Sequence, residues 1–382
     1  LVGFSLSYKN NLSFYCPLTH NSADDVNLPF DETLNILREL LGDKSLTVIG
    51  QNLKYDINVL KKYSMIFKNR IEDTMLMSYV LSSSGKHDMD TLSSKFLDHK
   101  PISYESVAGK GKDQISFADV EISKAVEYAC EDADLTFLLY QKLSTLLKKD
   151  KKLLKIYKEI EIKLMLIIAD MEYIGVSLNN RELSKQSQNL AKRIEKIEKS
   201  IYKISGREFN ISSPKQIQEI FYDELKLPIL KKTPKGQPST NEDVMSQLAE
   251  DHELPNLVLS YRNLLKLKNT YTDKLGDQVS NISNRLHTSY NQTITITGRL
   301  SSSSPNLQNI PIRTDDGKKI RSAFIPREGY KLFSADYSQI ELRIMAHLAK
   351  DSAMIESFLT GEDIHSSTAK KVFNIKEEPS SD

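Results

Sequence analysis

The sequence predicts an α/β unit, followed by a helical segment and then an α+β unit. Three observations support this division. Short β-type runs alternate with helical patterns over residues 1–149. From about residue 150 to residue 275 the pattern is helical and rich in lysine. Residues 285–297 then alternate polar and apolar side chains, as a half-buried antiparallel strand does.

Composition is that of an ordinary globular protein, and 382 residues are enough for two or three compact units. The net charge is only +1, so any binding to nucleic acid must come from local basic faces. Cys16 and Cys130 make no metal-ligand pattern and indicate a reducing compartment. The sequence has no signal peptide and no apolar run long enough to cross a bilayer.

The first unit begins with two β-type runs, residues 1–7 and 11–18. A helical pattern over 30–41 follows, and then a buried strand over 45–50. Because the chain opens with Leu1 inside strand-like sequence, we expect it to be a fragment of a longer protein.

Local signals place the ends of several helices in the middle segment. Gly175 is expected to end a helix in the left-handed conformation, just before a strand-like run. Ser213, followed by Pro214 and then by Gln216, is a capping box with proline at the first helical position. Residues 240–243 mark another helix start, and residues 231–239 form an exposed loop.

A change of period near the C-terminal end marks a candidate catalytic residue. Residues 331–335 are expected to form a strand, and residues 340–348 have helical spacing. Asp336 lies between the two, with Gln339 close by and Glu341 in the first helical turn. Such a carboxylate suits Mg²⁺, which prefers oxygen ligands. From its position alone, however, Asp336 would more often be a turn or helix-cap residue.

A second candidate site lies in the first unit. Asp56 follows a strand end, and Tyr128 and Asp132 share one face of a helix because they are four residues apart. Two carboxylates and a phenol suit a two-metal hydrolytic site, in which the tyrosine orients the attacking water. Taken singly, each helix acid is more often a solvated surface charge, and Glu131 and Asp134 are assigned to that class.

Two further stretches are candidates for nucleic-acid binding. Within residues 257–275, a basic and amide stripe suited to phosphates is formed by Arg262, Lys266 and Asn269. The alternative is a solvated amphipathic face. Residues 297–313 carry side chains that can donate to the minor-groove acceptors of any correct base pair, namely Arg299, Asn306 and Gln308. Here the alternative is a loop whose polar residues bond locally.

Several of these stretches resemble one known family. The string DYSQIELR at 336–343 resembles the first catalytic palm motif of the A family of bacterial DNA polymerases. TGRLSS at 297–302 and PNLQNIPIR at 305–313 resemble the segment of that family that contacts primer and template. The helix at 257–275 is similar to its thumb helix, and GEDIH at 361–365 to the start of its fingers.

The first unit resembles the 3′→5′ proofreading exonuclease domain attached to those polymerases. NLKYD at 52–56 and YACEDAD at 128–134 look like its second and third motifs. The resemblance implies a ribonuclease H-like exonuclease domain over residues 1–148 and a truncated polymerase domain over 149–382. Within the latter we expect a helical thumb at about 150–284, a partial antiparallel-sheet palm at about 285–347 and the start of the fingers at about 348–382.

The resemblance also implies roles for individual residues. In the palm, Asp336 binds both catalytic Mg²⁺ ions, the Tyr337 carbonyl adds a ligand, and Glu341 excludes a 2′-hydroxyl. In the exonuclease site, Asp56 and Asp132 bind metal and Tyr128 orients water. The incoming nucleotide is contacted by Gln339, Glu341 and His365. The DNA is contacted by Arg262, Lys266, Asn269, Arg299, Asn306, Gln308 and Arg313.

The expected activity is DNA-templated synthesis from dNTPs on a primer–template by two-metal nucleotidyl transfer, with associated proofreading. The resemblance implies a monomer in the bacterial cytoplasm, with two Mg²⁺ ions per active site. The family's Asp-x-Glu motif belongs before Leu1, and its fingers helix and His-Asp-Glu motif belong after Asp382. We therefore expect this piece alone to be inactive. Two alternatives are a non-catalytic DNA-binding relative and a nuclease whose C-terminal part only positions substrate.

Overall fold

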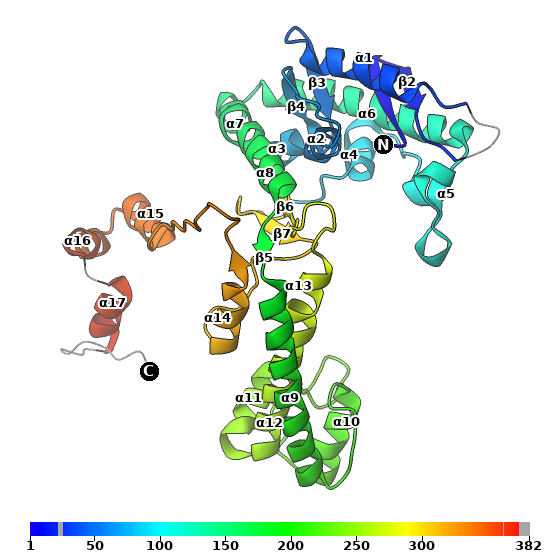
Figure 1. The fold of residues 1–382 in the computed structure, drawn as a ribbon. Helices are drawn as coiled ribbons and strands as arrows, with labels where there is room; N and C mark the ends of the chain where they lie inside the picture. Colours follow the sequence, from blue (N-terminus) through cyan, green and yellow to red (C-terminus); the bar gives the residue numbers. More distant parts are fainter. Residues whose placement is uncertain (22–25, 362, 374–382) are drawn as a thin grey trace. The chain divides into compact units, whose positions relative to one another are not determined.

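The structure is a computed structural model that describes residues 1–21, 26–361 and 363–373 (Figure 1). The chain divides into two compact units, Leu1–Ile325 and Pro326–Asp382. The described residues are rich in helix, and their strands form four two-stranded sheets. None of the helices in these ranges is long and apolar enough to cross a lipid bilayer.

The first unit opens with a hairpin of β1 (Gly3–Lys9) and β2 (Leu12–Pro17). β3 (Thr47–Gly50) and β4 (Arg70–Asp73) form a parallel pair. The long helix α6 (Ile122–Leu147) packs against β1, β2 and β3. The strands predicted at 1–7, 11–18 and 45–50 are confirmed, as is the helix at 30–41.

Most of the helices around these strands share one apolar core, to which α6 contributes the fully buried Leu139 and Leu143. Asp73 joins two of the helices, because its carboxylate accepts hydrogen bonds from the backbone N–H groups of Leu53 (2.7 Å) and Leu76 (2.9 Å). The start of the helix that carries Asp56 is thereby fixed. The helices are α1 (Phe30–Gly42), α2 (Leu53–Lys61), α3 (Thr74–Leu81), α4 (Met89–Leu97), α5 (Tyr104–Ala108), α7 (Lys151–Ile156) and α8 (Ile162–Ile174).

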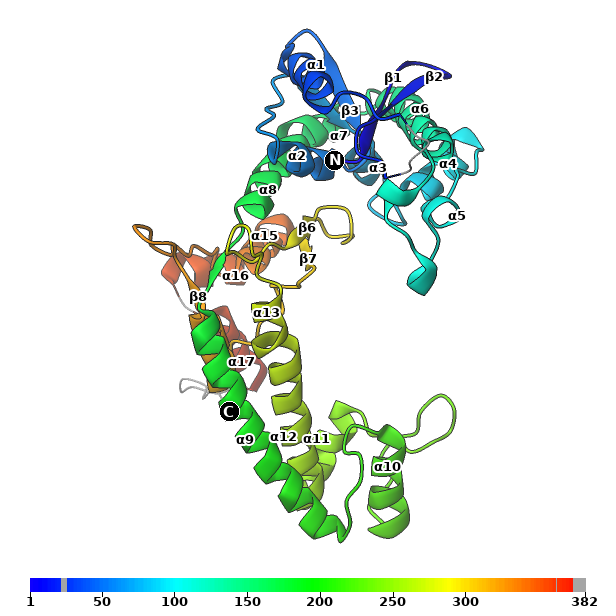
Figure 2. The ribbon, with the colours of Figure 1, turned by 45° about the vertical axis from the view of Figure 1, so that its right-hand side comes forward.

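A helical arm forms the middle of the first unit. Its longest helices, α9 (Asn180–Ser205) and α12 (Glu253–Leu267), pack side by side, as Figures 1 and 2 both show. The far end of the arm has its own core, in which Ile217, Phe221 and Met245 are fully buried. The other helices are α10 (Pro214–Gln218), α11 (Glu242–Asp251), α13 (Lys274–Asp277) and α14 (Asp315–Ser322), with π-helical turns at η3 (Tyr157–Glu161), η4 (Glu219–Glu224) and η5 (Lys268–Thr272).

The predicted helix ends in the middle segment are confirmed, but Gly175, with a ψ of −171°, does not take the left-handed helical conformation expected of it. Gly175 follows α8 with a φ of +66°, which favours glycine. A Cβ at this position would lie 2.6 Å from the Leu286 carbonyl oxygen. Ser213 caps α10 by accepting a hydrogen bond from the Gln216 N–H. The Gln216 side chain accepts instead from the Asn210 N–H at 2.6 Å, so the capping box is only half formed.

The strand predicted over residues 285–297 is wrong for most of its length. Only β6 (Ser289–Asn291) is a strand, and it pairs with β7 (Ser301–Ser303). Residues 292–300 form the connecting loop, in which Ile294 and Ile296 are 68% and 71% exposed. β7 is only three residues long, so it offers no partner to the alternating residues beyond Asn291. The other strands of this region, β5 (Ser177–Leu178) and β8 (Phe324–Ile325), pair with each other.

In the second unit, the helix of the predicted strand–helix junction is present and the strand is not. The helix is present as α15 (Ile340–Ala349). The strand predicted at residues 331–335 is wrong, because no strand of the described ranges pairs with it, and Phe333 is 91% exposed. The unit continues with α16 (Ser352–Thr360) and α17 (Ile364–Phe373).

Candidate active sites and nucleic-acid interface

Tyr128 and Asp132 lie together on α6, as the spacing predicts. The Tyr128 hydroxyl is hydrogen-bonded to the Asp132 carboxylate. Burial raises the pKa of Asp132 to about 6, while the hydrogen bond from Tyr128 lowers it, and Glu131 and Asp90 raise it. Burial, and then the Asp132 charge, raise the pKa of the Tyr128 phenol well above its usual range. The phenol is therefore protonated at neutral pH.

Asp56 lies in the first turn of α2, and its side chain is accessible to solvent. Desolvation nevertheless raises the pKa of Asp56 to about 7. A backbone hydrogen bond lowers this pKa, and the charge of Asp73 raises it further. The acidic neighbour of Asp56 is thus Asp73, whereas that of Asp132 is Asp90 on α4. The two predicted metal ligands lie on different helices, each in an environment that disfavours a bare charge.

The acids assigned to the solvated surface have specific partners instead. Glu131 accepts hydrogen bonds from His99 Nε2 (2.8 Å) and from the Ile102 N–H (2.6 Å). Asp134 accepts from the N–H of Asn11 at 2.8 Å. That assignment is therefore wrong, because both acids anchor loops to α6. Sequence reasoning also missed Asp90, whose proximity to α6 depends on tertiary packing.

Asp56 and Asp132 are oxygen donors of the kind that Mg²⁺ prefers. Within residues 1–21, 26–361 and 363–373, however, no group of three or more His, Cys, Asp or Glu side chains is placed to hold a metal ion. The donors present fit a magnesium site in their chemistry, and they make up only part of a full set of ligands.

The three residues of the predicted phosphate stripe line one hollow of about 610 Å³ in the helical arm. Lys266 and Asn269 are exposed there. Arg262 is half-buried and donates from Nη1 to the Thr240 carbonyl at 2.7 Å, and burial lowers the pKa of its guanidinium. Arg262 therefore also holds the loop before α11 in place, a role that sequence spacing alone does not indicate.

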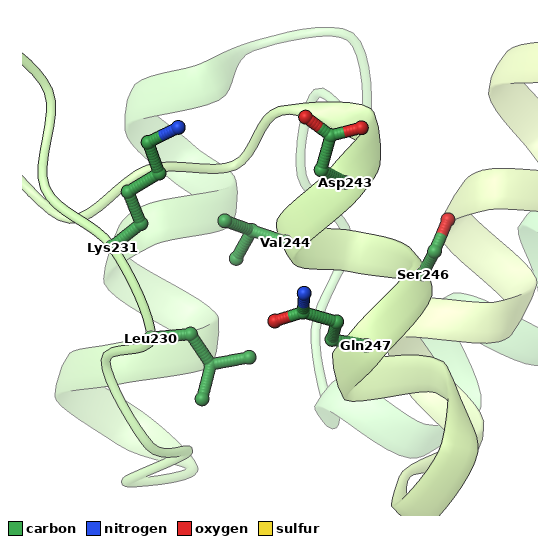
Figure 3. Close-up of a pocket in the computed structure, with 6 residues that line it drawn as sticks. All are labelled: Leu230, Lys231, Asp243, Val244, Ser246 and Gln247. Atoms are coloured by element: carbon green, nitrogen blue, oxygen red, sulfur yellow. The ribbon is translucent and has the colours of Figure 1, made fainter.

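A second hollow of about 610 Å³ lies at the same end of the arm, where the 230–231 segment faces the first turns of α11. Figure 3 shows Lys231 and Asp243 at this hollow, together with Leu230, Val244, Ser246 and Gln247. Since a cationic and an anionic side chain line it together, it is not a purely basic surface.

The four residues of 299–313 that are predicted to contact DNA are exposed, as a contact surface requires, and several also bond locally. Gln308 Nε2 donates to the Leu300 carbonyl at 3.0 Å. Asn306 Oδ1 accepts from the Gln308 N–H at 3.0 Å. The Arg299 carbonyl accepts from the Thr295 hydroxyl at 2.6 Å. The four residues are Arg299, Asn306, Gln308 and Arg313.

In the second unit, Asp336 and Tyr337 lie on an exposed irregular segment just before α15. Gln339 Nε2 donates to Asp363 Oδ1 at 2.9 Å. Because Asp363 also accepts from the Ser366 N–H, this bond brings the start of α15 to the start of α17, where His365 lies. Sequence reasoning missed Asp363, although an aspartate three residues before a serine at a helix start is a capping signal.

Glu341 is exposed in the first turn of α15, next to the Asp336 segment. Arg343 on the same helix donates from Nε to the Ser338 carbonyl at 3.0 Å. Its guanidinium carbon lies 4.5 Å from the centre of the Phe358 ring. These contacts favour a structural role for Arg343.

Comparison with known proteins identifies both parts of the chain. Residues 180–382 match the family described as DNA polymerase family A, and residues 1–148 match a 3′-5′ exonuclease family. The DNA polymerase I of Pseudomonas aeruginosa is 46% identical over 380 residues, which are 98% of this chain and 42% of that protein. The DNA polymerase I of Rhizobium leguminosarum is 43% identical over 395 residues, covering 98% of this chain and 39% of the relative.

A solved structure agrees with these relatives. The POL domain of Pol1 from M. smegmatis, in complex with a DNA primer-template and dNTP, superposes with a TM-score of 0.78 and 31% identity. The match covers 95% of this chain and 59% of that chain. The chain spans about two fifths of the length of the curated relatives. On these matches, the chain belongs to DNA polymerase family A and carries a 3′-5′ exonuclease domain ahead of its polymerase part.

Proposed function

We propose that the protein carrying this chain is a DNA-directed DNA polymerase that adds deoxynucleotides to a primer 3′-hydroxyl and proofreads its product. The observation that carries the proposal is the likeness, over 95% of this chain, to a Pol1 structure that contains a primer-template and dNTP. We further propose a ribonuclease H-like fold for the exonuclease part, a monomeric state and a bacterial cytoplasmic location.

In the polymerase site, the primer 3′-hydroxyl attacks the α-phosphate in line with the leaving pyrophosphate. Two Mg²⁺ ions, when bound, neutralise charge on the attacking and leaving oxygens. Asp336 and the Tyr337 carbonyl would hold them. Gln339 and His365 would contact the incoming nucleotide, and their two segments are joined by the Gln339–Asp363 hydrogen bond. Glu341 would occupy the space of a 2′-hydroxyl.

In the exonuclease site, Asp56 and Asp132 would hold metal and Tyr128 would orient the attacking water. The hydrogen bond between the protonated Tyr128 hydroxyl and Asp132 supports the role of Tyr128, because it keeps the phenol next to a proposed metal ligand. Desolvation raises the pKa of both Asp56 and Asp132, so an adjacent cation is expected to stabilise their charged forms.

The path proposed for the duplex follows two surfaces. On the helical arm, Lys266 and Asn269 would contact phosphates, next to Arg262. On the β6–β7 side, the minor groove near the primer end would be contacted by Arg299, Asn306, Gln308 and Arg313.

The proposal is tested by the binding of this chain to a primer–template over a salt series, measured by fluorescence anisotropy. Lys266→Ala is expected to weaken binding and to reduce the slope of log K against log salt by about 1, as for one lost phosphate contact. Arg299→Ala is expected to weaken binding to a recessed 3′ end.

Lys142→Ala provides the control, because Lys142 is an exposed lysine of α6 outside both surfaces. It should leave the affinity and the salt slope unchanged. If Lys266→Ala and Arg299→Ala chains fold correctly and bind like the unmodified chain, the proposed path of the DNA is wrong.

A further inference from the structure

We propose that Tyr79, on α3 of the exonuclease part, is a positioning residue for Arg299 of the polymerase part. The inference rests on the proposed function, in which Arg299 contacts the primer end. In this proposal the exonuclease part also stabilises the conformation of the 292–300 loop between β6 and β7, in which Arg299 lies.

The loop needs support from outside, because a two-stranded hairpin is marginally stable on its own. β6 and β7 are each only three residues long. The loop between them carries Ile294 and Ile296 largely exposed to solvent, so it has little apolar burial of its own. Its shape therefore depends on hydrogen bonds, both those to its backbone and those from the buried Gln292 side chain to Glu161.

A buried ion pair provides the first support, at the entry to the loop. Glu172 Oε1 lies 2.5 Å from Lys54 Nζ and also accepts from the Tyr290 N–H at 2.6 Å. Lys54 Nζ donates in turn to the Tyr290 carbonyl. Both main-chain groups of the central β6 residue are thus bound by side chains of α2 and α8. The pair occupies the outer edge of β6, where a third strand would otherwise lie.

Tyr79 provides the second support, within the loop itself. It is only 6% exposed, and its hydroxyl donates to the Thr295 carbonyl at 2.8 Å. The Thr295 hydroxyl then donates to the Arg299 carbonyl at 2.6 Å, which closes the turn that contains Gly298. A continuous path of two hydrogen bonds therefore runs from α3 to the Arg299 backbone.

The orientation of Tyr79 is itself fixed from the exonuclease side. Its ring packs edge-on against His87, with ring centres 5.6 Å apart. The Nδ1 atom of the His87 ring is hydrogen-bonded to the Ser78 hydroxyl at 2.9 Å. The backbone carbonyl of His87 accepts a hydrogen bond from Gln51 Nε2 at 2.7 Å. Because the ring is held by packing, Tyr79→Phe removes the hydroxyl with little other change.

The first experiment is hydrogen exchange of this 382-residue chain, read by mass spectrometry. Tyr79→Phe is expected to speed the exchange of amides in 293–299 by about fivefold, as for the loss of one net hydrogen bond. The matched control is Tyr222→Phe, since Tyr222 is 7% exposed and donates to the Ser239 carbonyl at 2.7 Å. It should change exchange near residue 239 and leave 293–299 unchanged. Unchanged exchange at 293–299 in Tyr79→Phe would overturn the proposal.

The second experiment separates positioning from mere stability. We expect Tyr79→Phe to lower the ratio of affinities for a recessed 3′ end over a blunt duplex, as Arg299→Ala does. The double variant should lose no more than Arg299→Ala alone, because both changes act on one contact. Equal losses for both duplexes, or additive losses in the double variant, would show that Tyr79 does not act through Arg299. If the unmodified chain binds neither duplex, the proposed function fails, and hydrogen exchange still decides whether Tyr79 holds the loop.

Discussion

Lys54 and Glu172, which are 118 positions apart in the sequence, form a buried ion pair with Nζ and Oε1 2.5 Å apart. Both side chains are about 10% exposed. Asn58 Nδ2 donates to the other carboxylate oxygen of Glu172 at 3.0 Å. Since both charges are nearly excluded from water, each depends on the other and on these additional hydrogen bonds.

Removing one partner of this pair should destabilise the chain strongly. Lys54→Met leaves the Glu172 charge buried, so we expect the free energy of unfolding to fall by about 3–5 kcal/mol. Urea unfolding followed by circular dichroism measures the change. Lys163→Met is the control. Lys163 pairs with Glu159 on an exposed helix face, with 63% of the lysine side chain accessible, so its replacement should change the free energy of unfolding far less than Lys54→Met does. Similar losses for the two variants would contradict the assigned role of burial.

The pH dependence of stability should carry the signature of Asp73. This carboxyl is 1% exposed, and burial raises its pKa from 3.8 to about 6. The folded chain therefore holds a proton that the unfolded chain loses near pH 4. Stability is full below that pH and falls as the pH rises towards 6, by about 2–3 kcal/mol for this residue. Asp73→Asn should remove this share of the slope from urea unfolding measured between pH 4 and 7, and leave the shares of Asp56 and Asp132, whose pKa values burial also raises.

Asp88 is the matched control, because it also caps a helix with its side chain, but the pKa of its carboxyl is lowered. Asp88 therefore contributes stability above the unfolded pKa and loses it as the pH falls. Asp88→Asn should change the pH dependence with the opposite sign from Asp73→Asn. The assignment of Asp73 would be contradicted if its replacement left the slope between pH 4 and 6 intact.

The local pair on α6 gives a prediction for the exonuclease site. The hydrogen bond from Tyr128 lowers the pKa of Asp132, against a larger effect of burial that raises it to about 6. Tyr128→Phe should therefore raise the pKa of Asp132 further, since the charged form loses a donor. Carbon-13 NMR titration of the carboxyl group measures the shift. Tyr104→Phe is the control, because its ring packs on Tyr128, and an equal shift in that variant would show that the hydrogen bond is not the cause.

What the sequence could predict depends on the range of the interaction. The Tyr128–Asp132 contact follows from helical spacing, and Gly175 and Ser213 carry their own helix-end signals. The strands expected at 285–297 and 331–335 could not be judged in this way, because a strand requires a partner that its own alternation does not specify. Three other features could not be predicted from the sequence either, since each joins elements that are distant along the chain. They are the proximity of Asp90 to Asp132, the Lys54–Glu172 ion pair and the Tyr79–Thr295 hydrogen bond.

Gly175 tests how tightly the end of α8 packs against the segment that leads into β6. Its φ of +66° is combined with a ψ of −171°, a region that essentially only glycine occupies. An added Cβ would also lie 2.6 Å from the Leu286 carbonyl oxygen and 2.9 Å from the His287 ring. We expect Gly175→Ala to lower the free energy of unfolding by about 2–4 kcal/mol.

The matched variant is Gly236→Ala, because Gly236 also has a positive φ, +81°, but has no atom within 4 Å of an added Cβ. At Gly236 only the cost of a positive φ for a residue with a Cβ remains, so the free energy of unfolding should fall by about 1 kcal/mol. The difference between the two variants isolates the contact with Leu286 and His287. Because these residues lie directly before β6, Gly175→Ala should also speed hydrogen exchange in 286–291, whereas Gly236→Ala should not. Equal losses of stability in the two variants would show that the approach of Leu286 to Gly175 is looser than the structure has it.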